Sequence, residues 1–137
     1  MLLCDRRIKR LCAGVGTAIY FLCAGLSILT YVDRTPKGTL VFQLFKPFET
    51  YEIAVIARGP AAVRLEALAD SEDNTERSPV VIYEDQTPLG PAHSSHADIR
   101  NLGRGRFSHW RRQGFVFAAS DNSNPNTNGR YYFAVLP

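Results

Sequence analysis

Nearly every position is hydrophobic in two stretches of the chain, Phe115-Val116-Phe117 and Tyr131-Tyr132-Phe133-Ala134-Val135-Leu136. Aromatic and β-branched residues dominate both stretches, which is typical of β-strands. A strand with one solvated face alternates hydrophobic and polar residues, whereas a strand covered on both faces does not. We therefore predict that these two stretches form central strands.

Five more short runs have a similar composition, and each is bounded by Gly, Pro, Asn or Asp. The seven predicted strands are Thr39–Phe45, Tyr51–Ala57, Val63–Ala69, Pro79–Tyr83, Arg106–Trp110, Phe115–Ala119 and Tyr131–Leu136. This number of strands in about 100 residues predicts a mainly β fold, a small antiparallel β-sandwich or jelly-roll over residues 39–137. Residues 63–68 are equally compatible with a helix, because Ala, Leu, Glu and Arg favour one.

Residues 11–32 contain no charged side chain. In a helix they would extend about 33 Å, enough for a hydrocarbon core of about 30 Å. We therefore predict one transmembrane helix at residues 11–32, preceded by a basic N-terminus (1–10) and followed by a linker (33–38). The alternative is a cleaved secretory signal, whose apolar region has only about 7–15 residues.

The net charge of +3 lies entirely before the predicted helix, where four basic residues stand against one acidic residue. Residues 33–137 carry twelve basic and twelve acidic side chains. This bias predicts a single-pass protein of the plasma (inner) membrane with a cytoplasmic N-terminus and its C-terminal domain on the outer, periplasmic side. A neutral domain lacks the positive footprint of a nucleic-acid-binding protein, so we expect no nucleic-acid partner.

The three cysteines, Cys4, Cys12 and Cys23, all lie in or beside the hydrophobic segment. The predicted β domain therefore has no internal disulfide, whichever compartment it occupies. Its stability must come from packing.

Two long segments of the domain are rich in turn-forming residues. Residues 87–105 are long enough to contain one short helix. We predict that it starts at Ser95, with Ser94 or Ser95 as N-cap and Asp98 in the first turn. Residues 120–130 connect the last two predicted strands and end in Asn128-Gly129, a turn signal, so we predict a long hairpin loop.

All three histidines, His93, His96 and His109, fall within 17 residues of one another. With Asp98 or Asp121 they resemble the ligands of a zinc or iron site, which makes a metal-dependent enzyme the alternative function. The spacing matches no established metal motif, so we expect no cofactor. Serines lie near these histidines, but no G-x-S-x-G sequence supports a hydrolase triad.

Trp110 stands among histidine and arginine residues, a combination suited to stacking on a sugar ring and to hydrogen bonding its hydroxyl or carboxylate groups. A tryptophan is also often a core residue, and that interpretation stays open. The predicted ligand-binding residues, from two long loops and the strands beside them, are His93, His96, Arg106, His109, Trp110, Asp121, Asn122 and Arg130.

Four segments carry a resemblance to a recurring sequence. They are Tyr83-Glu84-Asp85, residues 89–100 (Leu-Gly-Pro-Ala-His-Ser-Ser-His-Ala-Asp-Ile-Arg), residues 105–110 (Gly-Arg-Phe-Ser-His-Trp), and residues 120–130 from Ser-Asp-Asn-Ser to Asn-Gly-Arg. Together they cover roughly residues 80–137. The region resembles a segment of uncharacterised bacterial proteins and of accessory regions of glycosyltransferases and methyltransferases in surface-glycan pathways. This resemblance implies a bacterial envelope setting and assigns no catalytic residue.

The sequence thus favours a membrane-anchored, non-enzymatic module of the bacterial envelope that binds a glycan or a membrane protein. A purely structural membrane-associated protein is the third hypothesis, in which the conspicuous residues fasten two long loops onto the sandwich. The lipid bilayer is an expected partner through residues 11–32.

Overall fold

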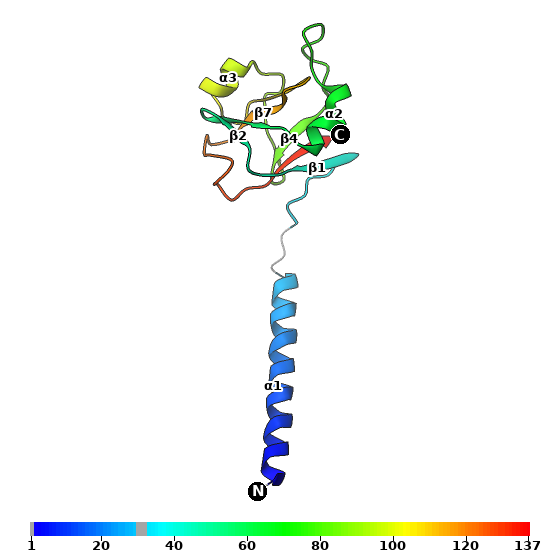
Figure 1. Ribbon diagram of the computed structural model, residues 1–137, viewed down its shortest axis with the longest axis vertical. Helices are drawn as coiled ribbons and strands as arrows, with labels where there is room; N and C mark the ends of the chain where they lie inside the picture. The colour runs from blue at the N-terminus through cyan, green and yellow to red at the C-terminus, as the bar shows by residue number, and fades with distance from the viewer. Residues whose placement is uncertain (1, 30–32) are drawn as a thin grey trace. The chain divides into compact units, whose positions relative to one another are not determined.

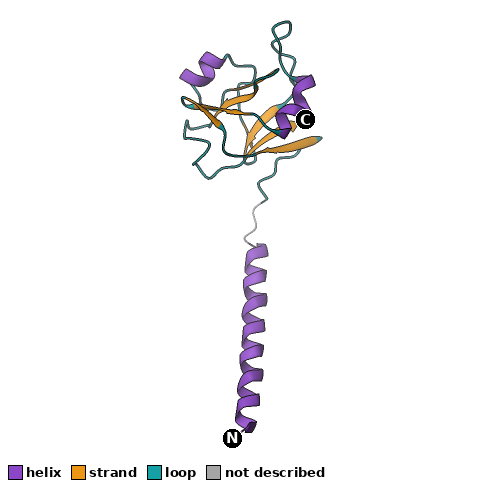
Figure 2. Ribbon diagram, in the orientation of Figure 1, coloured by secondary structure: helices purple, strands orange, loops and turns teal. Residues whose placement is uncertain are grey.

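The computed structural model describes residues 2–29 and 33–137. The chain forms two compact units, Met1–Asp33 and Arg34–Pro137, and each is considered by itself. Figures 1 and 2 show a long helix in the first unit and strands with short helices in the second.

The first unit is the helix α1, Leu2–Leu29. Large apolar side chains along it are exposed, among them Tyr20, Phe21 and Leu22. Over the described residues, no helix has both the length and the hydropathy needed to cross a membrane. The predicted span of residues 11–32 lies within α1 up to Leu29, and residues 30–32 lie outside the described residues.

The second unit contains two four-stranded antiparallel sheets, compatible with the predicted β-sandwich. The first sheet has the order β1 (Leu40–Leu44), β8 (Tyr132–Leu136), β4 (Val81–Glu84) and β5 (Thr87–Pro88). The second has the order β2 (Glu49–Tyr51), β3 (Ala54–Ala57), β7 (Gly114–Ala118) and β6 (Phe107–Trp110). Strands β7 and β8 each have two neighbours, which confirms that both are central.

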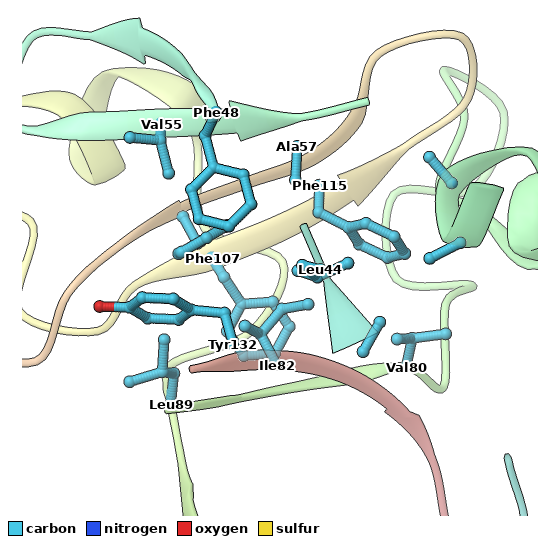
Figure 3. Packing of buried hydrophobic residues seen from close by; sticks show 14 of the residues in the cluster. Leu44, Phe48, Val55, Ala57, Val80, Ile82, Leu89, Phe107, Phe115 and Tyr132 are labelled. Carbon is cyan, nitrogen blue, oxygen red and sulfur yellow. The ribbon is translucent and has the colours of Figure 1, made fainter. Parts of the chain in front are cut away.

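The main hydrophobic core combines side chains from both sheets (Figure 3). Phe48 packs edge-to-face on Phe117 and on Tyr132, with ring centroids 5.4 and 6.0 Å apart. Phe117 belongs to the second sheet and Tyr132 to the first, so these rings join the two. Aromatic pairs of this geometry stabilise a fold by about 0.5–1.5 kcal/mol beyond the area they bury.

The prediction of a strand at Val63–Ala69 is wrong. The helix α2 (Pro60–Leu65) and the 3₁₀ turn η1 (Glu66–Leu68) occupy this segment. Pro60 has a fixed φ that suits the first turn of a helix, and Ala61, Ala62 and Leu65 are buried against the core. Helical spacing, rather than alternation, places these side chains on the core face.

The helix α3, His96–Asn101, begins where the sequence predicts, with Ser95 as its N-cap. The Ser95 hydroxyl accepts a hydrogen bond from the Asp98 backbone amide at 3.1 Å. Ile99 of α3 is fully buried with Val116 and Ala118 of β7. Because this small cluster covers the outer side of β7, that strand needs no polar face.

Two more predictions need correction. The run Tyr51–Ala57 is split by a tight turn, in which Glu52 has φ +58, so it yields the separate strands β2 and β3. Residues 120–130 do not form a hairpin loop, because β7 and β8 lie in different sheets. This segment instead crosses from one sheet to the other.

Candidate functional site

A cavity of about 360 Å³ gathers three of the predicted binding residues. We call it the histidine pocket; its lining residues are Thr75, His93, Ser94, Ser95, His96, Trp110 and Gln113. Ligand sites in proteins commonly have volumes of about 300–1,000 Å³. The pocket therefore lies within the size range of a small-molecule site.

Thr75 lies in the loop of residues 70–78, which forms one wall of the pocket. Backbone hydrogen bonds hold the start of this loop against β6. The Asp70 amide donates to the His109 carbonyl at 2.8 Å, and the Arg111 amide donates to the Asp70 carbonyl at 3.0 Å. Asp70 and Trp110 thus form an isolated parallel bridge. This contact fixes the start of the loop of residues 70–78 beside Trp110.

His93 is held by a buried carboxylate. Its Nδ1 atom lies 2.9 Å from Oδ2 of Asp70, a residue with no exposed surface. The other oxygen of Asp70 accepts a hydrogen bond from the Ser78 amide at 2.7 Å. Because a carboxylate only accepts, the proton of this contact lies on Nδ1 of His93 and the ring orientation is fixed. The ring nitrogen Nε2 is left for a ligand.

His96 lies edge-to-face with Trp110, with ring centroids 6.1 Å apart. Its Nε2 atom is buried and has no hydrogen-bond partner in the part of the chain that the structure describes. Burial lowers the pKa of His96, so the ring is neutral at pH 7. An unpaired buried polar atom costs free energy. Because Nε2 is buried, it is not open to a ligand, and His96 contributes to the pocket as part of its wall.

His109 is a core residue rather than a pocket residue. It is 1% exposed and stacks on Phe115 with a centroid distance of 4.3 Å. Its Nδ1 atom lies 2.8 Å from the Ser78 hydroxyl. Burial lowers its pKa to about 4, although Asp70 and Glu66 act in the opposite direction. His109 therefore supports Asp70 through Ser78, from behind the pocket.

The histidines do not gather around one point. His93 and His96 line the pocket, whereas His109 is buried behind it. Across residues 2–29 and 33–137, no group of three or more His, Cys, Asp or Glu side chains is placed to hold a metal ion. The geometry thus lends no support to the metal-dependent alternative.

Asp121 and Arg130 form a separate cluster with Glu84. The Arg130 guanidinium donates to both Asp121 oxygens, at 3.0 and 2.6 Å, and to Glu84 at 3.0 Å. Hydrogen bonds from Arg130, and then from Ser123, hold the pKa of Asp121 far below its usual range. The hydrogen bonds of Arg130 to Asp121 and to Glu84 raise the pKa of the guanidinium. We call Glu84, Asp121 and Arg130 the loop lock, because they fasten residues 120–130 to β4.

Asn122 and Arg106 also serve the local backbone. The side-chain oxygen of Asn122 accepts from the Arg104 amide at 2.5 Å, and its nitrogen donates to the Leu102 carbonyl at 3.3 Å. Arg106 donates to the Gly103 carbonyl at 3.1 Å. Neither residue lines the histidine pocket.

Of the eight predicted site residues, the structure therefore brings His93, His96 and Trp110 together in one pocket. Sequence reasoning missed Thr75, Gln113 and the buried Asp70. The only signal for Asp70 was a carboxylate directly after a hydrophobic run, at the start of a segment that reads as a solvated loop. This segment pairs with β6, which is distant in the sequence, so no local pattern predicts the contact.

The hydroxyl groups of the pocket serines are already engaged. Ser94 donates to the Pro91 carbonyl at 2.9 Å, and Ser95 donates to the Asp98 carboxylate at 2.8 Å. A serine nucleophile is activated by a general base such as histidine. Ser94 donates to a backbone carbonyl instead, and the carboxylate bonded to Ser95 belongs to Asp98, whose backbone amide Ser95 caps. The pocket offers an aromatic ring, an imidazole nitrogen, the Gln113 amide and the Thr75 hydroxyl.

Comparison of the chain with protein-family models, curated proteins and solved structures finds no match.

Proposed function

We propose that this protein is a membrane-anchored, non-enzymatic module of the bacterial envelope that binds a glycan in the histidine pocket. The observation that carries the proposal is the grouping of His93, His96 and Trp110 in one cavity of about 360 Å³. A half-buried tryptophan supplies an apolar face for a sugar ring, and the neighbouring polar groups bond to its hydroxyls.

The polar groups of this pocket suit hydroxyls because they are held in fixed roles. Asp70 orients His93, and the His96 ring packs edge-to-face with Trp110. A site prepared in this way loses little conformational freedom when a ligand binds. The alternative ligand chemistry, a metal ion, needs a third ligand that the described residues do not bring to this pocket.

Binding rather than catalysis is favoured because the pocket contains no activated nucleophile. The hydroxyls of Ser94 and Ser95 hold the turn that leads into α3. His93 has the carboxylate partner of a general base, but no hydroxyl donates to it within the structure's described part. These residues therefore form a recognition surface.

The membrane anchor rests on the sequence. Residues 11–32 carry no charge and follow a basic segment, and this run continues past the described part of α1. The basic side of such a segment faces the cytoplasm, which places the domain of residues 34–137 outside. The resemblance of residues 80–137 to segments of surface-glycan enzymes supports the same setting.

Calorimetric titration of the full chain in detergent micelles tests the pocket. The probes are glucose, mannose, N-acetylglucosamine and galacturonic acid, with the di- and trisaccharide of each. We expect at least one series to bind and Trp110→Ala to weaken that binding by up to about tenfold, since contact with an aromatic ring contributes about 0.5–1.5 kcal/mol beyond the area it buries.

The control is Phe45→Ala. Phe45 is an exposed aromatic residue, 70% accessible, and it does not line the pocket. This variant should bind as the parent does. Equal binding by the parent and by folded Trp110→Ala would contradict the assignment of the pocket.

A further inference from the structure

A second cavity, of about 410 Å³, shares two lining residues with the histidine pocket. Trp110 and Gln113 line both. The other residues that line this second cavity, which we call the turn cavity, are Ser71, Glu72, Asp73, Arg111 and Arg112. A ligand longer than one ring can therefore contact both cavities while it remains on Trp110.

Backbone hydrogen bonds hold the β6–β7 turn that forms one wall of the turn cavity. The Arg112 amide donates to the Glu66 carboxylate at 2.7 Å, and the Gln113 amide donates to the Trp110 carbonyl at 3.1 Å. The turn ends at Gly114, which has φ +84 and whose added Cβ would lie 2.5 Å from the Ala57 carbonyl oxygen. Only glycine fits there.

The opposite wall is a tight turn of the loop of residues 70–78. Ser71 and Asn74 exchange backbone hydrogen bonds at 3.0 and 3.1 Å. Glu72 and Asp73 lie between them, at the tip of this turn. Both walls of the cavity are therefore fixed before any ligand arrives, which reduces the entropic cost of binding.

The charges of the turn cavity balance. Arg111 and Arg112 are exposed and face a cavity that Glu72 and Asp73 also line. Among the described residues, none of these four side chains forms an ion pair within 4.0 Å. Two donors of fixed charge and two acceptors match a ligand that carries many hydroxyls and no net charge. An anionic sugar would gain from the arginines and lose to the carboxylates.

We propose that the turn cavity is a second sugar subsite, and that the protein recognises a neutral oligosaccharide of at least two rings with Trp110 at the junction. This inference rests on the proposed function, because it assumes that the first ring occupies the histidine pocket. Arg111 and Asp73 supply a donor and an acceptor to the second ring, and Gln113 contacts both rings.

Calorimetry with the full chain in detergent micelles tests the inference. The probes are N-acetylglucosamine, glucose and mannose, their di- and trisaccharides, and galacturonic acid with its di- and trimer. We expect a neutral disaccharide to bind about tenfold more tightly than its monosaccharide, the effect of about 1.4 kcal/mol from a second set of contacts. The paired variant Arg111→Gln with Asp73→Asn should abolish most of that gain. Both positions are exposed, and the pair keeps the net charge unchanged.

The matched control is Arg104→Gln, an exposed arginine that lines neither cavity; it should keep the disaccharide gain. Equal affinity for mono- and disaccharides, with both lost in Trp110→Ala, would overturn the second subsite and leave the proposed function standing. Tighter binding of the galacturonate series would overturn the neutral-sugar assignment. Failure of every probe to bind would overturn the proposed function together with this inference.

Discussion

At the scale of single residues, Asp70 connects the pocket to the core. One of its oxygens orients His93, and the other accepts from the Ser78 amide. The Ser78 hydroxyl in turn contacts buried His109. A change of charge on His109 would therefore reach His93 in the pocket through three successive hydrogen bonds.

The buried His109 makes stability depend on pH. Its pKa is about 4 in the folded chain, whereas an unfolded histidine has a pKa of about 6.5. Between these values the unfolded chain binds a proton that the folded chain does not. The free energy of unfolding should therefore fall by up to about 3 kcal/mol as the pH drops from about 6.5 to about 4.

Urea unfolding at pH 7.5, 5.5 and 4.5 measures this effect. In His109→Asn, which keeps a polar group near Ser78, the pH dependence should be clearly weaker than in the parent. Burial also lowers the pKa of His96, and this contribution remains in both proteins. Identical slopes against pH in the two proteins would contradict the assignment to His109.

At the scale of elements, the segment of residues 120–130 joins two sheets and is fastened by the loop lock. Glu84 is 7% exposed, and it accepts from Arg130 at 3.0 Å and from the Tyr132 hydroxyl at 2.8 Å. The Ser120 hydroxyl also donates to Glu84. Removal of the cation that pairs with a buried carboxylate strongly destabilises the fold, because the remaining charge is buried without its ion-pair partner.

We expect Arg130→Met to reduce the free energy of unfolding by about 2 kcal/mol, without changing the affinity of the histidine pocket for sugars. Arg104→Met is the matched control, because Arg104 is exposed, and its effect should stay within about 0.5 kcal/mol. Chemical unfolding and calorimetry separate the two properties. Loss of sugar binding in a still-folded Arg130→Met protein would show that Arg130 belongs to the binding site after all.

The elements also show where sequence reasoning succeeds. Strands β7 and β8 were predictable because a strand covered on both faces has a distinctive unbroken hydrophobic run. Residues 63–69 were predicted as a strand from the regular spacing of the strands around them, although the composition of residues 63–68 is equally compatible with the helix that the structure contains. The pocket was foreseen only in part, since His93 and Trp110 are conspicuous by chemistry. Thr75 joins them through a pairing between distant segments, which no local pattern encodes.

At the scale of the whole molecule, the proposed function requires a membrane anchor as well as a binding domain. We predict that the full chain stays with the membrane fraction after washing with alkaline carbonate, since the uncharged run of residues 11–32 would lie in the hydrocarbon core. A chain that lacks residues 1–33 should appear in the supernatant. Recovery of the full chain in the supernatant would contradict the anchor.

We propose above that a sugar binds against Trp110. This residue is the only tryptophan of the chain, so its fluorescence reports on the two cavities that it lines, the histidine pocket and the turn cavity. The most direct measurement is a fluorescence titration of the full chain with the neutral and acidic sugar series. We expect a saturable change in Trp110 emission with a neutral oligosaccharide. Unchanged emission with every sugar at millimolar concentration would contradict it.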